Sequence, residues 1–175
     1  QRGARIRGPS ELCGRSHRFG GAQLEVLSPC PEFDAGLDPN DNSLVVRLRY
    51  GAHAFLFSGD IEAAAEAQLQ HHATRLRAHV LKVPHHGSAT SSSAAFLRAV
   101  GPRLAVLSAG AINRFGHPHP DVVARYGAEG VRLLQTPRDG GVELTSDGKQ
   151  LRVDTWAARA GLARASRLLV TADGG

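Results

Sequence analysis

The chain has 175 residues, of which 42% are hydrophobic, and it carries a formal net charge of +5. This length suits one domain with a core of moderate size, and the apolar fraction is enough to fill that core, so disorder is not expected. No apolar run approaches the roughly 20 residues of a membrane-spanning helix, and nothing at the N-terminus resembles a signal peptide. Only Lys82 and Lys149 among the 21 basic residues are lysine. Arginine suits bidentate phosphate contacts, but a GC-rich coding sequence would give the same bias, so charge is only supporting evidence for a nucleic-acid partner.

The first half of the chain predicts three strands and a long loop. Residues 1–19 are expected to be a loop or the remnant of an upstream connection, because the segment is rich in Arg and Gly and has little periodicity. Strands are expected at 23–27, 44–50 and 54–57, with a turn-rich loop at 31–42. The last two strands would form an antiparallel hairpin that turns at Gly51.

The second half alternates helices with strands. A helix is expected over 61–77, followed by a strand at 80–83, a helix at 94–100, a strand at 104–107 and a helix at 120–126. Strands at 131–134, 142–145 and 151–153 are separated by strong turn signals. Residues 156–175 are expected to be a terminal helix or a disordered tail. This order predicts the α/β fold class.

The two cysteines, Cys13 and Cys30, belong to no Cys-x-x-Cys motif. Two unrelated buried thiols are the expected arrangement, and a disulfide is the alternative if the domain is exported. Neither cysteine has the neighbours of a catalytic thiolate.

Residues with metal-ligand chemistry follow three of the predicted strands. Asp60 comes after the strand at 54–57, His85 and His86 come after the strand at 80–83, and His117 and His119 follow the strand at 104–107. Sites on layered α/β scaffolds are usually assembled from such strand ends. A carboxylate can offer one oxygen to each of two cations, and neutral imidazoles can complete the shell of zinc or manganese. Two cations can then hold a phosphate and activate a water.

Each of these residues also has an ordinary structural use. Asp60 could be the N-cap of the helix at 61–77, which is worth about 1 kcal/mol, and His119 could cap the helix that begins at Pro120. Adjacent residues on an extended segment point to opposite sides, so only one of His85 and His86 is expected to face the metals, and His86 is preferred. The remaining histidines are interpreted as surface or core residues: His17, His53, His71, His72 and His79.

Five motifs occur in one order along the chain: residues 40–43 (NDNS), 57–62 (FSGDIE), 82–88 (KVPHHGS), 91–93 (SSS) and 113–120 (NRFGHPHP). Together they resemble the C-terminal metallo-β-lactamase-like domain of the ComEC family of DNA-internalisation competence proteins, over about residues 20–153. The resemblance implies an αββα sandwich. The first metal motif of that family, His-x-His-x-Asp-His, does not occur in the sequence, so residues 20–155 are expected to be only the C-terminal half of such a domain.

The resemblance implies a metal-dependent nuclease that degrades one strand of incoming DNA. Asp60 would bridge two divalent ions, zinc or manganese, and His117 would bind one of them. Further ligands are expected upstream, so this chain alone is expected to be inactive. The expected roles overlap: His86, Ser88 and His85 as catalytic residues, His86 also as a metal ligand, and Gly87, Ser88 and His119 as residues that contact the substrate.

The same resemblance implies the partners and the location. The expected partners are DNA, in single-stranded form, and the membrane channel of the same parent protein, with no nucleotide cofactor. The domain is expected at the extracytoplasmic face of the bacterial cell membrane, with the cytoplasm as the alternative. Two other functions remain open: a metallo-hydrolase of a small phosphodiester or another ester, and a DNA-binding scaffold without catalysis.

Overall fold

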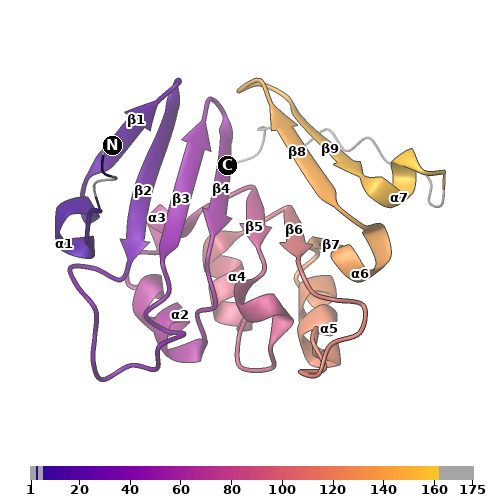
Figure 1. Ribbon diagram of the computed structural model, residues 1–175, viewed down its shortest axis with the longest axis horizontal. Helices are drawn as coiled ribbons and strands as arrows, with labels where there is room; N and C mark the ends of the chain where they lie inside the picture. The colour runs from indigo at the N-terminus through magenta and orange to yellow at the C-terminus, as the bar shows by residue number, and fades with distance from the viewer. Residues whose placement is uncertain (1–2, 4–5, 162–175) are drawn as a thin grey trace.

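The computed structural model describes residue 3 and residues 6–161, and its centre is a seven-stranded mixed sheet (Figure 1). The strands lie in chain order. Neighbouring strands from β1 to β4 are antiparallel, and neighbouring strands from β4 to β7 are parallel. Their bounds are Ser16–Phe19 (β1), Ala22–Ser28 (β2), Val45–Tyr50 (β3), His53–Phe57 (β4), Val80–Lys82 (β5), Leu104–Leu107 (β6) and Arg132–Gln135 (β7). The predicted α/β class is confirmed.

Helices cover one face of this sheet: α2 (Ala63–Gln70), α3 (Ala73–Leu76), α4 (Ala94–Val100) and α5 (Pro120–Ala128) (Figure 1). Leu56, Leu81 and Leu107 point to this face from β4, β5 and β6, and they share a buried cluster with Phe96 of α4 and Tyr126 of α5. Since side chains alternate along a strand, the residues between them face the other way.

The other face of β5, β6 and β7 is covered by a separate antiparallel pair, β8 (Val142–Ser146) and β9 (Leu151–Thr155). Leu151 and Val153 of β9 pack against Val80, Leu104 and Leu134. Two short helices, α6 (Thr136–Asp139) and α7 (Trp156–Arg159), flank the pair. The parallel strands are therefore covered on both faces, which explains why they are short, nearly continuous apolar runs in the sequence.

The turn between β3 and β4 touches the turn between β8 and β9. The backbone N–H of Ala52 donates to the carbonyl of Gly148 at 2.7 Å, and His53 Nδ1 lies 2.8 Å from Ser146 Oγ. Gly51 has a φ of +55°, and a Cβ there would overlap the backbone of Gly148. The two turns therefore meet backbone to backbone.

The N-terminal segment differs from the loop expected over residues 1–19. It contains a short helix, α1 (Pro9–Leu12), and β1, which pairs with β2. A bridge between Cys13 and Val26 brings Cys13 to the end of β2, where it forms a disulfide with Cys30, with the two Cα atoms 5.6 Å apart. The prediction of two unrelated thiols is wrong. The sequence could not reveal the disulfide, because the spacing of the cysteines does not indicate which segments pair at the edge of the sheet.

The helix predicted over 61–77 is shorter and broken. It begins at Ala63, and residues 71–72 separate α2 from α3. Its first turn is capped from a distance, because Oδ1 of Asp41 accepts hydrogen bonds from the backbone N–H of Glu62 at 2.7 Å and of Ala65 at 3.2 Å. Asp41 therefore does what the sequence assigned, as an alternative, to Asp60.

The C-terminal expectation is tested only in part. The helix α7 lies at the predicted place, and residues 162–175 lie outside the described residues. Within the part of the chain that the structure describes, no helix is both long and apolar enough to cross a membrane.

Candidate active site

The loops that follow β4, β5 and β6 meet at one edge of the sheet, because the three strands are parallel. Backbone hydrogen bonds connect them: His85 N–H donates to the carbonyl of Gly59 at 3.2 Å, and His119 N–H donates to the carbonyl of Gly87 at 2.8 Å. The Ser58 hydroxyl adds a bond to the carbonyl of Lys82 at 2.7 Å. These bonds fix the relative positions of all three groups of predicted site residues.

The loop after β5 has an unusual backbone. His85 and His86 have φ angles of 44° and 52°, and Gly87 follows at 80°. Side chains with a Cβ rarely adopt this left-handed conformation, which costs roughly 1–2 kcal/mol per residue. The segment is therefore a tight turn (Pro84–Gly87) and not an extended strand end. The extended geometry assumed for the two histidines is therefore wrong, and the preference for His86 as the residue that faces the metals stays a prediction.

A buried polar network holds the far side of this turn. The Ser91 hydroxyl donates to the carbonyl of Pro84 at 3.1 Å. The carboxylate of Glu66, fully buried, accepts from the backbone N–H groups of Ser92 and Ser93. Burial raises the pKa of Glu66, and the two backbone bonds oppose that rise. Strained turns persist only where neighbours over-determine them, and this network supplies such neighbours.

His86 faces Asp60 across the edge of the sheet. Nε2 of His86 lies 3.6 Å from Oδ1 of Asp60, and the two side chains are 46% and 42% exposed. Nδ1 of His86 lies 2.7 Å from the carbonyl oxygen of Ser108. A carbonyl can only accept, so Nδ1 carries the hydrogen and the neutral ring has its lone pair on Nε2. Two acceptor atoms, a carboxylate oxygen and an imidazole nitrogen, therefore face one another and can share either a proton or a cation.

His85 and His117 form a second pair at this edge of the sheet. Nδ1 of His85 is 2.8 Å from Oε1 of Glu62, close enough for an ion pair, but this buried nitrogen makes no hydrogen bond. The rings of His85 and His117 meet edge to face with centroids 5.7 Å apart. The sequence reasoning left Glu62 out of the site, although it lies two residues after Asp60, because nothing in the pattern indicates that its side chain turns back toward His85.

His117 is held by its own loop. The side-chain oxygen of Asn113 accepts from the backbone N–H of His117 at 3.0 Å, and its amide nitrogen donates to the His117 carbonyl at 2.6 Å. The ring of Phe115 stacks on the imidazole with an interplanar angle of 18°. Burial lowers the pKa of His117, and the neighbouring histidines lower it further. This shift favours the neutral form of His117, which is the form in which imidazole binds a metal.

The other predicted residues shape the loops. The Ser88 hydroxyl is engaged with the Thr90 hydroxyl at 2.9 Å. His119 Nδ1 accepts from the backbone N–H of Asp121 at 3.3 Å, which is the capping role left open above. At Gly87 a Cβ would come within 2.9 Å of both Leu107 and Pro118, so this glycine is required by packing as well as by its φ.

Lys82 is a further charged residue at this edge. Its Nζ donates to the carbonyl of Val83 at 2.8 Å. Burial lowers the pKa of Lys82, and the charge of Asp60 acts in the opposite direction. Sequence reasoning did not assign it a role, and its place at the end of β5, just before the histidine turn, was the available signal.

The side chains at this edge are of the types that bind a metal, but too few of them are grouped together. Asp60 supplies a carboxylate, and His86 and His117 supply imidazoles, which is the mixed shell that zinc or manganese accepts. Among residues 3 and 6–161, however, no three His, Cys, Asp or Glu side chains are grouped closely enough to hold an ion. These residues alone therefore do not complete a metal site.

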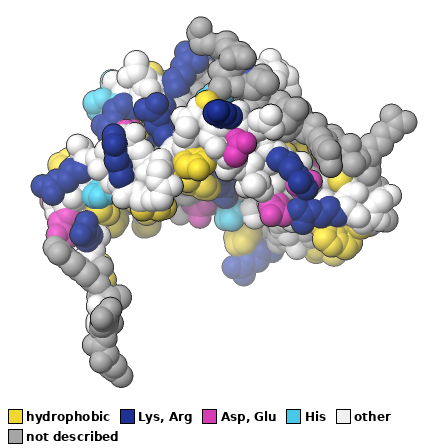
Figure 2. Space-filling view, turned by 90° about the horizontal axis from the view of Figure 1, so that it is seen from above, with side chains coloured by type: hydrophobic (Ala, Val, Ile, Leu, Met, Phe, Trp, Pro, Cys, Tyr) yellow, Lys and Arg dark blue, Asp and Glu magenta, His cyan; other side chains and the backbone are white. Residues whose placement is uncertain are grey.

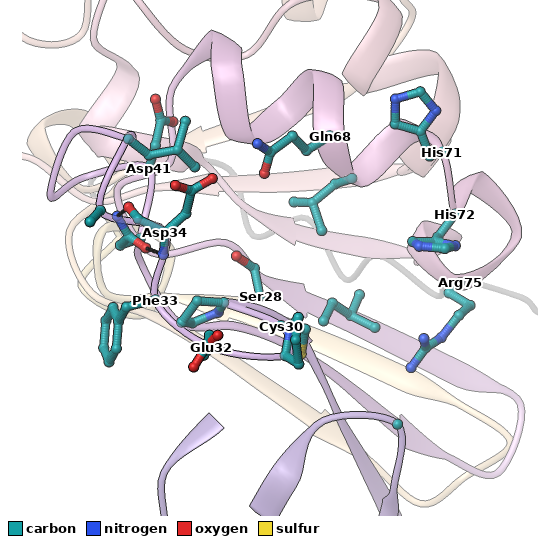
Figure 3. A pocket seen from close by; sticks show the side chains of 18 residues that line it. Ser28, Cys30, Glu32, Phe33, Asp34, Asp41, Gln68, His71, His72 and Arg75 are labelled. Carbon is teal, nitrogen blue, oxygen red and sulfur yellow. Dashed lines mark hydrogen bonds between the residues drawn. The ribbon is translucent and has the colours of Figure 1, made fainter. Parts of the chain in front are cut away.

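A separate pocket of about 530 Å³ lies between the loop after β2 and helix α2 (Figure 3). Glu32 and Asp34 border it from the loop, and His72 and Arg75 border it from the opposite side. None of the predicted site residues lines it. The candidate site is thus an open edge of the sheet and not this pocket.

Comparison with known proteins identifies the family. No protein-family model matches the chain. Three curated relatives are ComE operon protein 3 of Bacillus subtilis (34% identical over 121 residues), Competence protein ComA of Neisseria gonorrhoeae (37% over 127) and Recombination protein 2 of Haemophilus influenzae (35% over 112). The matches cover 69%, 72% and 64% of this chain.

This chain is a ComEC-like domain. The family resemblance drawn from the motifs is confirmed. The matches cover 15%, 18% and 14% of the three relatives, so this ComEC-like chain corresponds to less than a fifth of each.

Proposed function

We propose that this ComEC-like chain is part of a metal-dependent nuclease that acts in DNA uptake and cleaves phosphodiester bonds of the strand that is not transported. The names of two relatives, a competence protein and a ComE operon protein, support the uptake role. The net charge of +5 is compatible with a phosphate-rich substrate.

The pair formed by His86 and Asp60 carries the nuclease proposal. Its two acceptor atoms lie 3.6 Å apart, and the hydrogen bond to the Ser108 carbonyl leaves the lone pair of the neutral ring on Nε2. Without a cation or an added proton between them, the two atoms repel. The left-handed turn that presents His86 also costs stability, and such strain is concentrated at functional sites.

These positions support the following roles for the individual residues. Asp60 and His117 would help to hold the divalent ions, and His86 would serve as a further ligand or as donor to the phosphate. Glu62 lies 2.8 Å from His85, whose ring contacts His117. When bound, the ions would bring phosphate and water together and lower the pKa of that water.

The missing ligands are proposed to come from residues other than those described, as in an αββα metallo-β-lactamase-like domain of which this chain is the C-terminal half. The present sheet, with helices on one face, is compatible with one half of such a sandwich. The much greater length of the relatives leaves room for the other half.

The proposed partners are single-stranded DNA and a membrane channel in the same parent protein. The proposed location is the extracytoplasmic face of the membrane. The Cys13–Cys30 disulfide supports this location, because disulfides persist in oxidising compartments.

The test is cleavage of labelled single-stranded DNA by the protein encoded by the complete gene, with manganese or zinc and with EDTA. Asp60→Asn should abolish cleavage and weaken metal binding measured by calorimetry. The matched control is Glu129→Gln, which removes a carboxylate that pairs with Arg98 on the surface and should leave both unchanged.

A folded, metal-loaded protein that does not cut DNA would contradict the nuclease proposal. The absence of a three-ligand group among the described residues favours a DNA-binding scaffold as the second candidate. That candidate predicts DNA binding that neither EDTA nor Asp60→Asn alters.

A further inference from the structure

A second pocket, of about 690 Å³, lies at the edge of the sheet opposite the candidate active site. It is formed where β3 ends and β4 begins, and by the residues just before β5 and β6. The lining residues are Arg47, Arg49, Gly51, Ala52, His53, Ala54, Arg77, Ala78, His79, Val100, Gly101 and Arg103.

The charged side chains that line this pocket are all positive. Four of the residues that line it are arginines, and no acidic side chain is among the described residues of the lining. Arg47 lies 3.6 Å from Glu25, on the neighbouring strand. Arg49, Arg77 and Arg103 are exposed. Figure 2 looks onto this edge and shows Lys and Arg side chains gathered over it, with few acidic ones.

A histidine adds a neutral donor. Nδ1 of His79 accepts the backbone N–H of Ala54 at 3.0 Å, so the hydrogen of the neutral ring lies on Nε2. Burial lowers the pKa of His79, and the charges of His53, Arg103 and Arg47 lower it further. The ring can therefore donate one hydrogen bond to an anion without adding to the positive charge.

The chemistry of the lining identifies the ligand class. Guanidinium groups bind phosphate oxygens bidentately. The pocket has no aromatic side chain other than imidazole in its described lining, so it offers no platform on which bases could stack. Contacts to phosphates alone carry no sequence information.

We infer that this basic pocket is a second nucleic-acid site, which binds the phosphates of a single DNA strand without sequence preference. The choice of DNA rests on the proposed function. The parallel strands between the two edges have three to five residues. At a rise of about 3.3 Å per residue, the pocket and the candidate site are therefore roughly 10–17 Å apart. One strand of a few nucleotides can span that distance and contact both.

The test is the salt dependence of binding of this chain to a labelled oligothymidylate of about 20 nucleotides, long enough for several contacts, in EDTA so that no cleavage occurs. Each phosphate of a single strand that the protein neutralises adds about 0.7 to the steepness of log K against log salt. Arg49→Gln/Arg77→Gln should therefore make this slope shallower by about 1.4 and weaken binding at low salt at least about tenfold.

Two control variants separate the pocket from total charge and from folding. Arg152→Gln/Arg159→Gln removes the same charge from the β8–β9 hairpin and the helix after it, and should leave the slope unchanged. Arg49→Lys/Arg77→Lys keeps the charge and should retain most of the slope. Circular dichroism and urea unfolding confirm that the variants fold.

Equal slopes for the pocket variant and the hairpin variant would overturn the inference. So would binding of pyrophosphate by the wild type, with the pocket arginines required, without binding of the oligonucleotide, because the ligand would then be a small anion. The result is independent of the nuclease test, because the slopes of the pocket variant and the hairpin variant are compared in EDTA, whether or not the protein encoded by the complete gene cuts DNA.

Discussion

At the scale of single residues, the left-handed pair His85 and His86 has an energetic consequence. Replacing His86 by Gly or by Ala removes the same ring and the same bond to Ser108, but only Gly adopts a φ of 52° without steric cost. We expect His86→Gly to be more stable than His86→Ala by roughly 1 kcal/mol. Urea unfolding measures the difference, and equal stabilities would show that the turn is not strained.

Gly87 illustrates a different constraint, close packing. Ala at position 87 would clash with Leu107 and Pro118, whereas Gly116 has a similar φ, +67°, and open space around it. We expect Gly87→Ala to destabilise the fold by about 1–3 kcal/mol more than Gly116→Ala does. The two variants share the backbone cost, so the difference in unfolding midpoint isolates the packing contribution.

His79 should make stability depend on pH. The pKa of His79 is lowered in the folded state, mainly by burial, from the 6.5 of the unfolded chain. At pH values between the lowered pKa and 6.5, the unfolded chain therefore binds more protons than the folded one. The contribution of His79 to stability is therefore present above pH 6.5 and is lost as pH falls through the lowered pKa. We expect His79→Gln to lose less stability than the wild type between pH 8 and about pH 5. Parallel stability curves for the two proteins would contradict this assignment.

At the scale of elements, the sequence predicts those that depend on local pattern. The strands at 44–50, 80–83 and 104–107 and the helix at 94–100 lie within one residue or so of their predicted bounds. Ser93 caps that helix by accepting from Phe96 N–H, as its position suggests. The elements missed depend on distant partners: β1 is defined by its pairing with β2, and the start of α2 by Asp41.

The disulfide fastens the α1–β1 segment to the end of β2. It joins cysteines 17 residues apart, and for a loop of that size chain entropy gives about 3 kcal/mol of stabilisation. We expect Cys13→Ser/Cys30→Ser to lower the free energy of unfolding by roughly 2–4 kcal/mol under oxidising conditions. Under reducing conditions the wild type should fall to the level of the variant, and mass spectrometry of the untreated protein should show both thiols oxidised.

At the scale of the whole molecule, the order of the motifs predicts which residues share an edge, since parallel strands bring their carboxyl ends together. Asp60 and His86 meet for that reason. The order of the motifs does not predict where each side chain points. The contact between Glu62 and His85 and the clamp of Asn113 on His117 depend on turn conformations that the residue pattern does not specify.

The close approach of Gly51 to Gly148 links two hairpins that are nearly a hundred residues apart in the sequence. A side chain at position 51 would force the β8–β9 turn away, so the two turns cannot diverge independently. In a library of random variants, substitutions at position 51 should be recovered only together with a change in the length or course of the 147–149 turn. This pair of glycines would then appear as covariation between distant segments, although neither residue contributes a side chain to any contact.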